Sequence, residues 1–225
     1  MMMNLFSIFD PTSTLLPKLN LNWSSTLMML ILLPKTFWLI LPRKNILMNN
    51  LMLSMHNEIK ILMSNFKINS TLMYVSLFFF ILYNNFMGLF PYIFTSTSHL
   101  TTSLALSIPM WIMMMLFGWM KNMNHMFTHL VPQNTPNMLM PFMVMIESIS
   151  NFIRPLTLAV RLTANIIAGH LLMTLMSSIS TKISMISSLL LVLTQISLLI
   201  LEYAVSIIQS YVFMVLITLY SSELK

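Results

Sequence analysis

Cysteine is absent from this chain, glycine occurs only three times, and charged residues make up only 7% of its 225 residues. Without cysteine the chain has no disulfide framework and no iron–sulfur or zinc–thiolate site. Three glycines also exclude the glycine-rich loops that bind nucleotide phosphates. We therefore predict no cofactor, no bound metal and no nucleotide chemistry in this chain.

The scarcity of charge also indicates the solvent in which the chain folds. A soluble domain carries about a quarter charged residues, whereas 57% of this chain is hydrophobic. Long apolar runs alternate with short polar breaks, so most side chains must face lipid or other buried helices. The net charge of +6 does not indicate nucleic-acid binding, because lysine and arginine are scattered at the ends of apolar segments. We predict an all-α integral membrane protein, a single membrane domain over residues 1–225.

The first half of the chain divides into three parts. Residues 23–41 are predicted to cross the membrane once. Residues 45–67 place apolar side chains three and four positions apart, which is typical of an amphipathic helix lying in the membrane interface. Residues 71–120 are predicted to form a hairpin of two crossings, with a loop that lacks lysine and arginine and therefore faces outward. Basic residues around the amphipathic helix mark the inner side: Arg43, Lys44, Lys60 and Lys67.

Residues 138–220 hold two apolar stretches, 138–179 and 183–220, separated near Lys182. A continuous helix over either stretch would reach about 60 Å, twice the hydrocarbon thickness of a bilayer. Each stretch must tilt strongly or break into paired crossings, and the lack of turn-forming dipeptides inside them favours tilt. Pro155 is expected to kink the first stretch, because it removes a backbone donor. The predicted fold thus has about three upright crossings, one interfacial helix and two long tilted helices.

Ionisable side chains inside the two long stretches are the candidates for function. A charge at the centre of a membrane costs about 2.5 to 3.5 kcal/mol, so such side chains usually face a partner or a water-filled cavity. Five lie in these stretches: Glu147, Arg154, Arg161, His170 and Glu202. The first three recur every seven residues and therefore line one face of a helix. The second stretch repeats this spacing with Gln195, Glu202 and Gln209.

Each candidate also has a structural interpretation. Arg161 could pair with Glu147 or Glu202 and so stabilise the helix pair. Arg154 lies beside the proline and could bond carbonyls that the kink frees. His170 alone is more often a packed histidine than a proton carrier, although Glu202 and Gln209 on the second stretch and a titration near neutral pH make a relay plausible. Four further histidines lie in loops or interfacial segments and are assigned no role: His56, His99, His125 and His129.

Three motifs carry a resemblance to a known family. The run RPLTLAVRLTANIIAGH, residues 154–170, resembles the signature of subunit a of F-type ATP synthases, called subunit 6 in mitochondria. The run NNFMGLFPY, residues 84–92, resembles the outward end of that family's third segment, and LEYAVSIIQSYVF, residues 201–213, resembles its last helix. The similarity covers essentially the whole chain. It implies a proton-translocating stator subunit of the mitochondrial inner membrane, with two half-channels that couple proton flow to c-ring rotation and ATP synthesis.

The resemblance also implies a role for each matching residue. Arg161 matches the family's essential arginine, which faces the c-ring and meets the carboxylate of each passing c-subunit. Asn165 matches the polar residue one turn further along. Glu147 matches the acidic residue associated with the inner half-channel. Arginine suits the gate between half-channels because it stays protonated and so opposes a direct leak of protons.

The outer half-channel is implied to use residues from both long helices. His170 and Glu202 match the pair proposed to feed protons from the outer side, in the mitochondrial rather than the bacterial arrangement. Gln209 matches the residue opposite the essential arginine. The implied partners are the c-ring subunits, other membrane-sector and peripheral-stalk subunits, and the lipid bilayer.

Two other classes of protein stay open from the sequence. A secondary transporter would use intramembrane Arg and Glu side chains to bind an anionic substrate, but its expected broken helices and internal repeats are not apparent. A purely structural subunit would only scaffold a membrane complex, and it predicts that Arg161 and Glu202 are inert. The chain lacks a Walker-type loop, so it is not predicted to be an enzyme.

Overall fold

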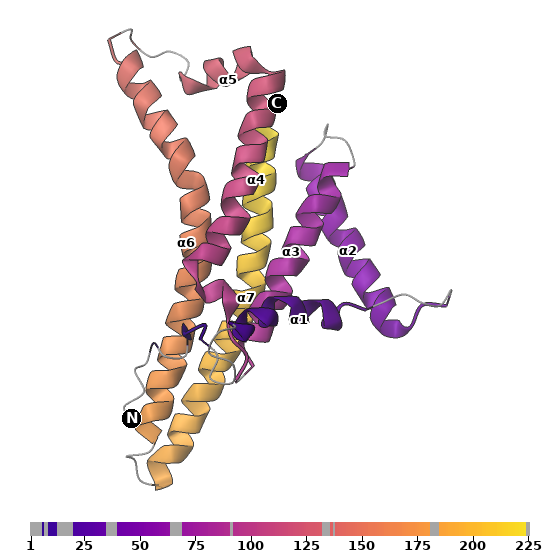
Figure 1. Cartoon of the computed structure of the whole chain (residues 1–225), viewed down its shortest axis with the longest axis vertical. Coiled ribbons are helices and arrows are strands. Elements are labelled where there is room, and N and C mark those ends of the chain that lie inside the picture. Colours follow the sequence, from indigo (N-terminus) through magenta and orange to yellow (C-terminus); the bar gives the residue numbers. More distant parts are fainter. Residues whose placement is uncertain are drawn as a thin grey trace.

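The computed structural model describes residues 6, 9–12, 20–34, 40–63, 69–90, 92–131, 136, 138–180 and 185–223, and most of these residues are helical. Its elements in chain order are η2 (Leu21–Ser24), α1 (Ser25–Leu32), α2 (Arg43–Leu62), α3 (Asn69–Gly88), η3 (Ser96–Ser98), α4 (Leu100–Lys121), α5 (Met123–Leu130), α6 (Met140–Ser180) and α7 (Met185–Glu223). No strand occurs within these residues, so the predicted all-α class is confirmed for them (Figure 1).

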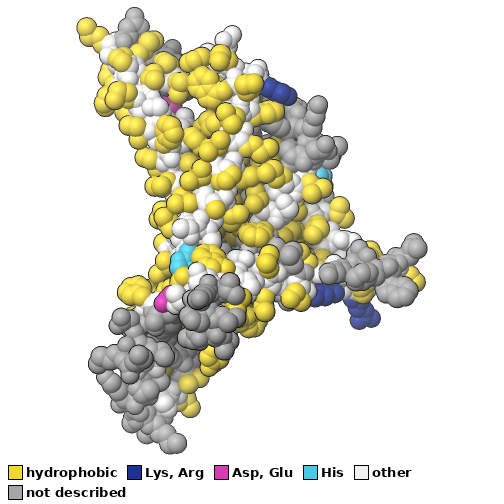
Figure 2. All heavy atoms as spheres, viewed as in Figure 1, with side chains coloured by type: hydrophobic (Ala, Val, Ile, Leu, Met, Phe, Trp, Pro, Cys, Tyr) yellow, Lys and Arg dark blue, Asp and Glu magenta, His cyan; other side chains and the backbone are white. Residues whose placement is uncertain are grey.

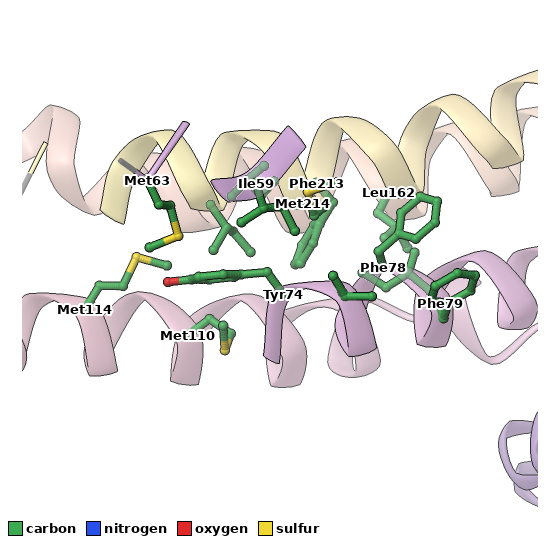
Figure 3. Close-up of a cluster of buried hydrophobic side chains, with 14 residues drawn as sticks. Ile59, Met63, Tyr74, Phe78, Phe79, Met110, Met114, Leu162, Phe213 and Met214 are labelled. Carbon is green, nitrogen blue, oxygen red and sulfur yellow. The ribbon is translucent and has the colours of Figure 1, made fainter. Parts of the chain in front are cut away.

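The helices α3, α4, α6 and α7 form the body of the molecule. The most extensive contacts join α3 with α7, α4 with α6, and α6 with α7. Figure 3 shows the buried apolar cluster between them, to which α3 contributes Tyr74 and Phe78, α4 contributes Met110, and α7 contributes Met214. Ile59, which is fully buried, extends this cluster to α2. The amphipathic helix is therefore packed onto α3 and α7 through its apolar side chains.

The two long apolar stretches form two unbroken helices. α6 has 41 residues and α7 has 39, and α6 continues through Pro155. At 1.5 Å per residue each helix is about 60 Å long. The prediction of continuous helices rather than paired crossings is therefore confirmed, whereas their tilt in a membrane stays a prediction. The two helices lie side by side where α6 ends and α7 begins, and α4 packs against α6 toward the other end (Figure 1).

Four helices are long and apolar enough to cross a membrane among the described residues. They contain the segments Thr71–Gly88, Leu100–Lys121, Met140–Ile179 and Ser187–Ser222. The first two correspond to the predicted hairpin of residues 71–120. α2 (Arg43–Leu62) begins two residues before the predicted interfacial helix over residues 45–67 and ends at Leu62, and residues 64–68 lie outside the described part.

The first predicted crossing is shorter in the structure than the sequence suggests. α1 has only eight residues and ends at Leu32, because Leu33 takes an extended conformation with φ −62° and ψ 125°. Leu33 precedes Pro34, and a residue before proline is disfavoured in a helix. α1 is not among the four candidate spans, and residues 35–39 lie outside the described part. Of the three upright crossings expected, the structure thus contains two helices of sufficient length, α3 and α4, and a crossing over residues 23–41 stays a prediction.

The outer surface of the molecule is mostly apolar. Hydrophobic side chains cover most of the face shown in Figure 2, and charged side chains on it are few, with basic ones gathered at the lower right. Large exposed apolar residues follow α6, including Ile149, Phe152, Leu156 and Val160. Exposure of this extent is unfavourable in water and fits a chain covered by lipid or by partner helices.

Candidate functional site

A cavity of about 290 Å³ lies between α3, α6 and α7. α6 contributes Asn165 and His170 to its walls, and α7 contributes Glu202 and Gln209. The seven-residue spacing on α7 places its two polar residues on one helical face, which the packing turns toward α6. The structure therefore brings together four of the residues that the sequence singles out. No hydrogen bond joins His170 directly to Glu202 among the contacts of the described residues, so the two share a cavity rather than a bond.

Glu202 approaches α6 closely because residue 169 is glycine. A Cβ atom on Gly169 would lie 2.6 Å from Oε1 of Glu202 and 3.0 Å from its Cδ. Non-bonded atoms do not approach so closely, so a larger residue here would displace the carboxyl group. Gly169 therefore sets where the acid of α7 lies relative to α6.

Buried polar atoms beside this cavity have no partner in the described part of the chain. These atoms are Oε1 of Glu202 and both side-chain polar atoms of Asn85, which α3 supplies. Asn85 is only 4% exposed. A buried polar group without a hydrogen bond costs about 1–3 kcal/mol, and such groups are rare unless they serve a function. The arrangement is suited to hydrating the cavity and to passing a proton between polar groups.

A second cavity, of about 550 Å³, lies between α4, α5, α6 and the end of α7. Glu147 and Arg154 of α6 both line it, with 3.7 Å between Oε1 of Glu147 and Nη2 of Arg154. The guanidinium carbon of Arg154 lies 4.9 Å from the centre of the Tyr220 ring, which is within the range of a cation–π contact. Glu147 thus has a basic partner, but this partner is Arg154 and not Arg161.

Arg161 lies between the two cavities along α6 and lines neither of them. It follows Arg154 by seven residues and precedes Asn165 by four, which correspond to about 10 Å and 6 Å along a helix. Its side chain is exposed, and no residue that the structure describes forms an ion pair with it. The structural interpretation in which Arg161 pairs with Glu147 or Glu202 is therefore wrong within the described chain. The guanidinium projects instead from the apolar outer face of α6.

Asn85, Gly169 and Ser206 also line the first cavity. They fall inside the three motifs, but the sequence assigns no role to any of them individually. The Asn84–Asn85 pair inside an apolar segment was the available signal, since polar residues within membrane helices are usually functional. Only one of the pair lines the cavity, because Asn84 donates a hydrogen bond to the carbonyl of Phe80 at 3.1 Å. Gly169 had the weaker signal of being one of only three glycines.

These features define a class of protein: a helical membrane protein with cavities that place ionisable side chains along two long apolar helices. Comparison with known proteins narrows this class. The profile of the family described as ATP synthase A chain matches residues 21–222. The chain is 60% identical to ATP synthase subunit a of Aedes aegypti and 56% identical to that of Drosophila melanogaster, with all of each chain covered. It is also 58% identical to the protein of the same name from Locusta migratoria, with 99% of each chain covered. The chain therefore belongs to the ATP synthase A chain family, which forms part of the enzyme's membrane sector.

Proposed function

We propose that this chain is the proton-translocating stator subunit of the membrane sector of ATP synthase in the mitochondrial inner membrane. It provides two half-channels that couple proton flow to rotation of a c-ring and so to ATP synthesis. It has no phosphoryl-transfer site of its own, and the chemistry of ATP takes place in partner subunits. Its partners are the c-ring, other membrane-sector subunits and the peripheral stalk.

One observation carries this proposal: two separate cavities, each lined by ionisable side chains, flank an exposed arginine on a single helix, and this arginine has no ion-pair partner among the described residues. A continuous channel would let protons cross without rotation. Two cavities separated along α6 require the proton to leave one, travel on another body and return to the other. Arg161 projects from the face where that body would pass.

The neighbours of each cavity support an assignment of sides. The Glu147 cavity is lined by Trp119 and Met126, which flank Lys121 at the end of α4. Positive residues mark the inner side, so this cavity is the inner half-channel. The His170 cavity is lined by Leu89, which precedes the loop without lysine or arginine. That cavity is therefore the outer half-channel.

The residue types suit these roles. Imidazole and carboxylate exchange protons readily, so His170 and Glu202 can pass protons from the outer side, with Asn165 and Gln209 holding water in line. Glu147 performs the exchange on the inner side, close to Arg154. Arginine stays protonated in proteins and can hold a deprotonated c-ring carboxylate by charge and by two parallel hydrogen bonds.

The competing transporter class is less well supported. Its binding sites are typically formed where transmembrane helices are interrupted, whereas α6 and α7 are continuous through both cavities. A scaffold role also has little support, because it gives no reason why the buried Oε1 of half-buried Glu202 and the buried amide of Asn85 both lack partners among the described residues.

Replacement of Arg161 by glutamine tests the proposal. ATP synthesis should be measured in vesicles that contain the reconstituted complex under an imposed proton gradient, with assembly checked independently. We expect synthesis to be lost in a fully assembled complex, because the permanent positive charge is gone. Arg161→Lys serves as the control for charge alone and is expected to restore little, since lysine lacks the planar fork and loses its proton more easily when desolvated. Normal coupled synthesis in Arg161→Gln would refute the proposal and favour the scaffold role.

A further inference from the structure

We propose that His99 is a positioning residue for His170 and acts through Phe9. This inference rests on the proposed role of His170 in the outer half-channel. It assigns a function to a histidine in the loop between α3 and α4 and to residues 9–12, neither of which lines the cavity.

The first contact is a hydrogen bond between His99 and the backbone of Phe9. Nε2 of His99 lies 2.9 Å from the carbonyl oxygen of Phe9, ninety residues away in the chain. A carbonyl oxygen only accepts, so Nε2 must carry the proton and donate it. The bond therefore fixes both the tautomer of His99 and the position of Phe9.

The backbone of His99 is itself held in place. Its carbonyl accepts a hydrogen bond of 2.8 Å from Oγ1 of Thr102, and its N–H donates to the carbonyl of Ser96 at 3.2 Å. Oγ1 of Thr102 also lies 2.7 Å from the carbonyl of Ser96. The start of α4 and the preceding turn thus form a fixed support.

Two aromatic rings hold the imidazole of His99. The centre of the Trp23 ring lies 5.5 Å from that of His99, and the centre of the Phe94 ring lies 5.3 Å away. Trp23 and Phe94 also contact each other edge to face, with 5.6 Å between ring centres. Aromatic pairs at such distances contribute about 0.5–1.5 kcal/mol each, so the imidazole has little freedom to turn away from Phe9.

Residues 9–12 have a second attachment beyond Phe9. Nδ2 of Asn22 donates to the carbonyl of Thr12 at 3.3 Å, and the N–H of Thr12 donates to Oδ1 of Asp10 at 3.1 Å. The segment is thus fixed at both ends, one end on the loop before α4 and the other on η2. This arrangement holds the Phe9 side chain against α6.

The last contact reaches the cavity. The rings of Phe9 and His170 lie edge to face, with 6.2 Å between centres and 84° between planes. A histidine that passes protons must present the correct ring nitrogen to the cavity, and a freely rotating ring does so only part of the time. Phe9 occupies one side of the ring and so limits its rotation. Through the fixed carbonyl of Phe9, His99 determines where that restraint lies.

The experiment compares variants at His99 and Phe9 in the assembled complex. His99→Phe keeps an aromatic ring between Trp23 and Phe94 but removes the donor, whereas His99→Gln keeps an N–H near the Nε2 position. We expect His99→Phe to reduce coupled proton flux by about threefold to tenfold, the factor that the loss of one hydrogen bond corresponds to. We expect His99→Gln to retain most of the proton flux. His56 lies in α2, and we expect His56→Phe to have normal flux. Proton flux is recorded as a function of the pH on the outer side. We expect His99→Phe to change this pH profile, and we expect His99→Gln and His56→Phe to leave it unchanged.

Phe9→Ala provides an independent variant, since it leaves the backbone carbonyl in place and removes only the ring that contacts His170. It should reproduce the fall in flux, and combining it with His99→Phe should add little. Equal losses in His99→Phe and His99→Gln, or normal flux in Phe9→Ala, would overturn the inference. If His99→Phe does not assemble, Phe9→Ala decides alone. Normal flux in Phe9→Ala beside a loss in Arg161→Gln would overturn this inference only, whereas normal synthesis in Arg161→Gln would overturn both proposals.

Discussion

Glu202 of α7 lies so close to Gly169 of α6 that a Cβ atom on the glycine would fall 2.6 Å from Oε1 of Glu202. The acid proposed to carry protons is thus located by the absence of a side chain on the neighbouring helix. Because Gly169 directly precedes His170 in the chain, the same point of contact fixes both members of the proposed proton-transfer pair.

Gly169→Ala is therefore expected to reduce proton flux by displacing the carboxyl group. Misplacing a reacting group by about 1 Å lowers rates by up to about a hundredfold, so we expect a loss of tenfold or more in ATP synthesis. The helix itself should become more stable, since alanine is favoured over glycine in a helix interior by about 1 kcal/mol. ATP synthesis and thermal disassembly of the complex measure the two effects separately.

A double variant tests whether the steric explanation is correct. Aspartate is shorter than glutamate by one methylene, so Gly169→Ala combined with Glu202→Asp relieves the clash. The double variant should be more active than the product of the two single losses predicts. Strictly multiplicative losses would mean that Gly169 acts in some way other than by admitting the Glu202 carboxyl.

Asn85→Leu is predicted to separate stability from function. Both side-chain polar atoms of Asn85 are buried without partners among the described residues. Replacement by an apolar residue of similar volume therefore removes a desolvation cost of about 1–3 kcal/mol. The disassembly temperature should stay the same or rise, while proton flux falls because the cavity loses a polar wall. Asn84→Leu is the matched control: Asn84 does not line the cavity, and its amide donates to the carbonyl of Phe80. An equal loss of flux in both variants would show that Asn85 has no special place in the path.

Arg154→Gln should have a much smaller effect than Arg161→Gln. The side chains of Arg154 and Glu147 are 29% and 36% exposed, and their charged atoms are 3.7 Å apart. Partly exposed pairs of this kind contribute at most about 1 kcal/mol, so we expect ATP synthesis to fall by no more than about fivefold. A loss of synthesis as complete as that in Arg161→Gln, at normal assembly, would mean that Arg154 is itself required for proton release and does not only neighbour Glu147.

Much of the architecture is readable from the sequence because the bilayer imposes simple lengths. The hairpin of α3 and α4 and the two long helices follow from runs of apolar residues without turn signals. The first crossing over residues 23–41 stays a prediction, because α1 ends at Leu32 before Pro34 and residues 35–39 lie outside the described part. Hydropathy counts apolar residues and takes no account of that local restriction.

The site was predictable to the extent that it depends on helical spacing. Glu202 and Gln209 share one face of α7, as their spacing predicts, and in the structure this face lines one cavity with Asn165 and His170 of α6. The pairing of Glu147 with Arg154 follows from distance along α6: Arg154 lies about 10 Å further along the helix, whereas Arg161 lies about 21 Å away, beyond the reach of the two side chains. The contributions of Asn85 and His99 depend on contacts between distant segments, for which spacing along the chain gives no signal.

The central claim is that the two cavities open to opposite sides of the membrane, with Arg161 between them. Because the chain has no cysteine, single cysteines can be introduced and labelled with a membrane-impermeant thiol reagent added to one side at a time. The three positions are Asn165 in the first cavity, Ser148 in the second, and Ser210, which is fully buried and serves as the control. We predict that Asn165→Cys reacts only from the outer side, Ser148→Cys only from the inner side, and Ser210→Cys from neither. Reaction of Asn165→Cys and Ser148→Cys from the same side, or of either one from both sides, would contradict the account.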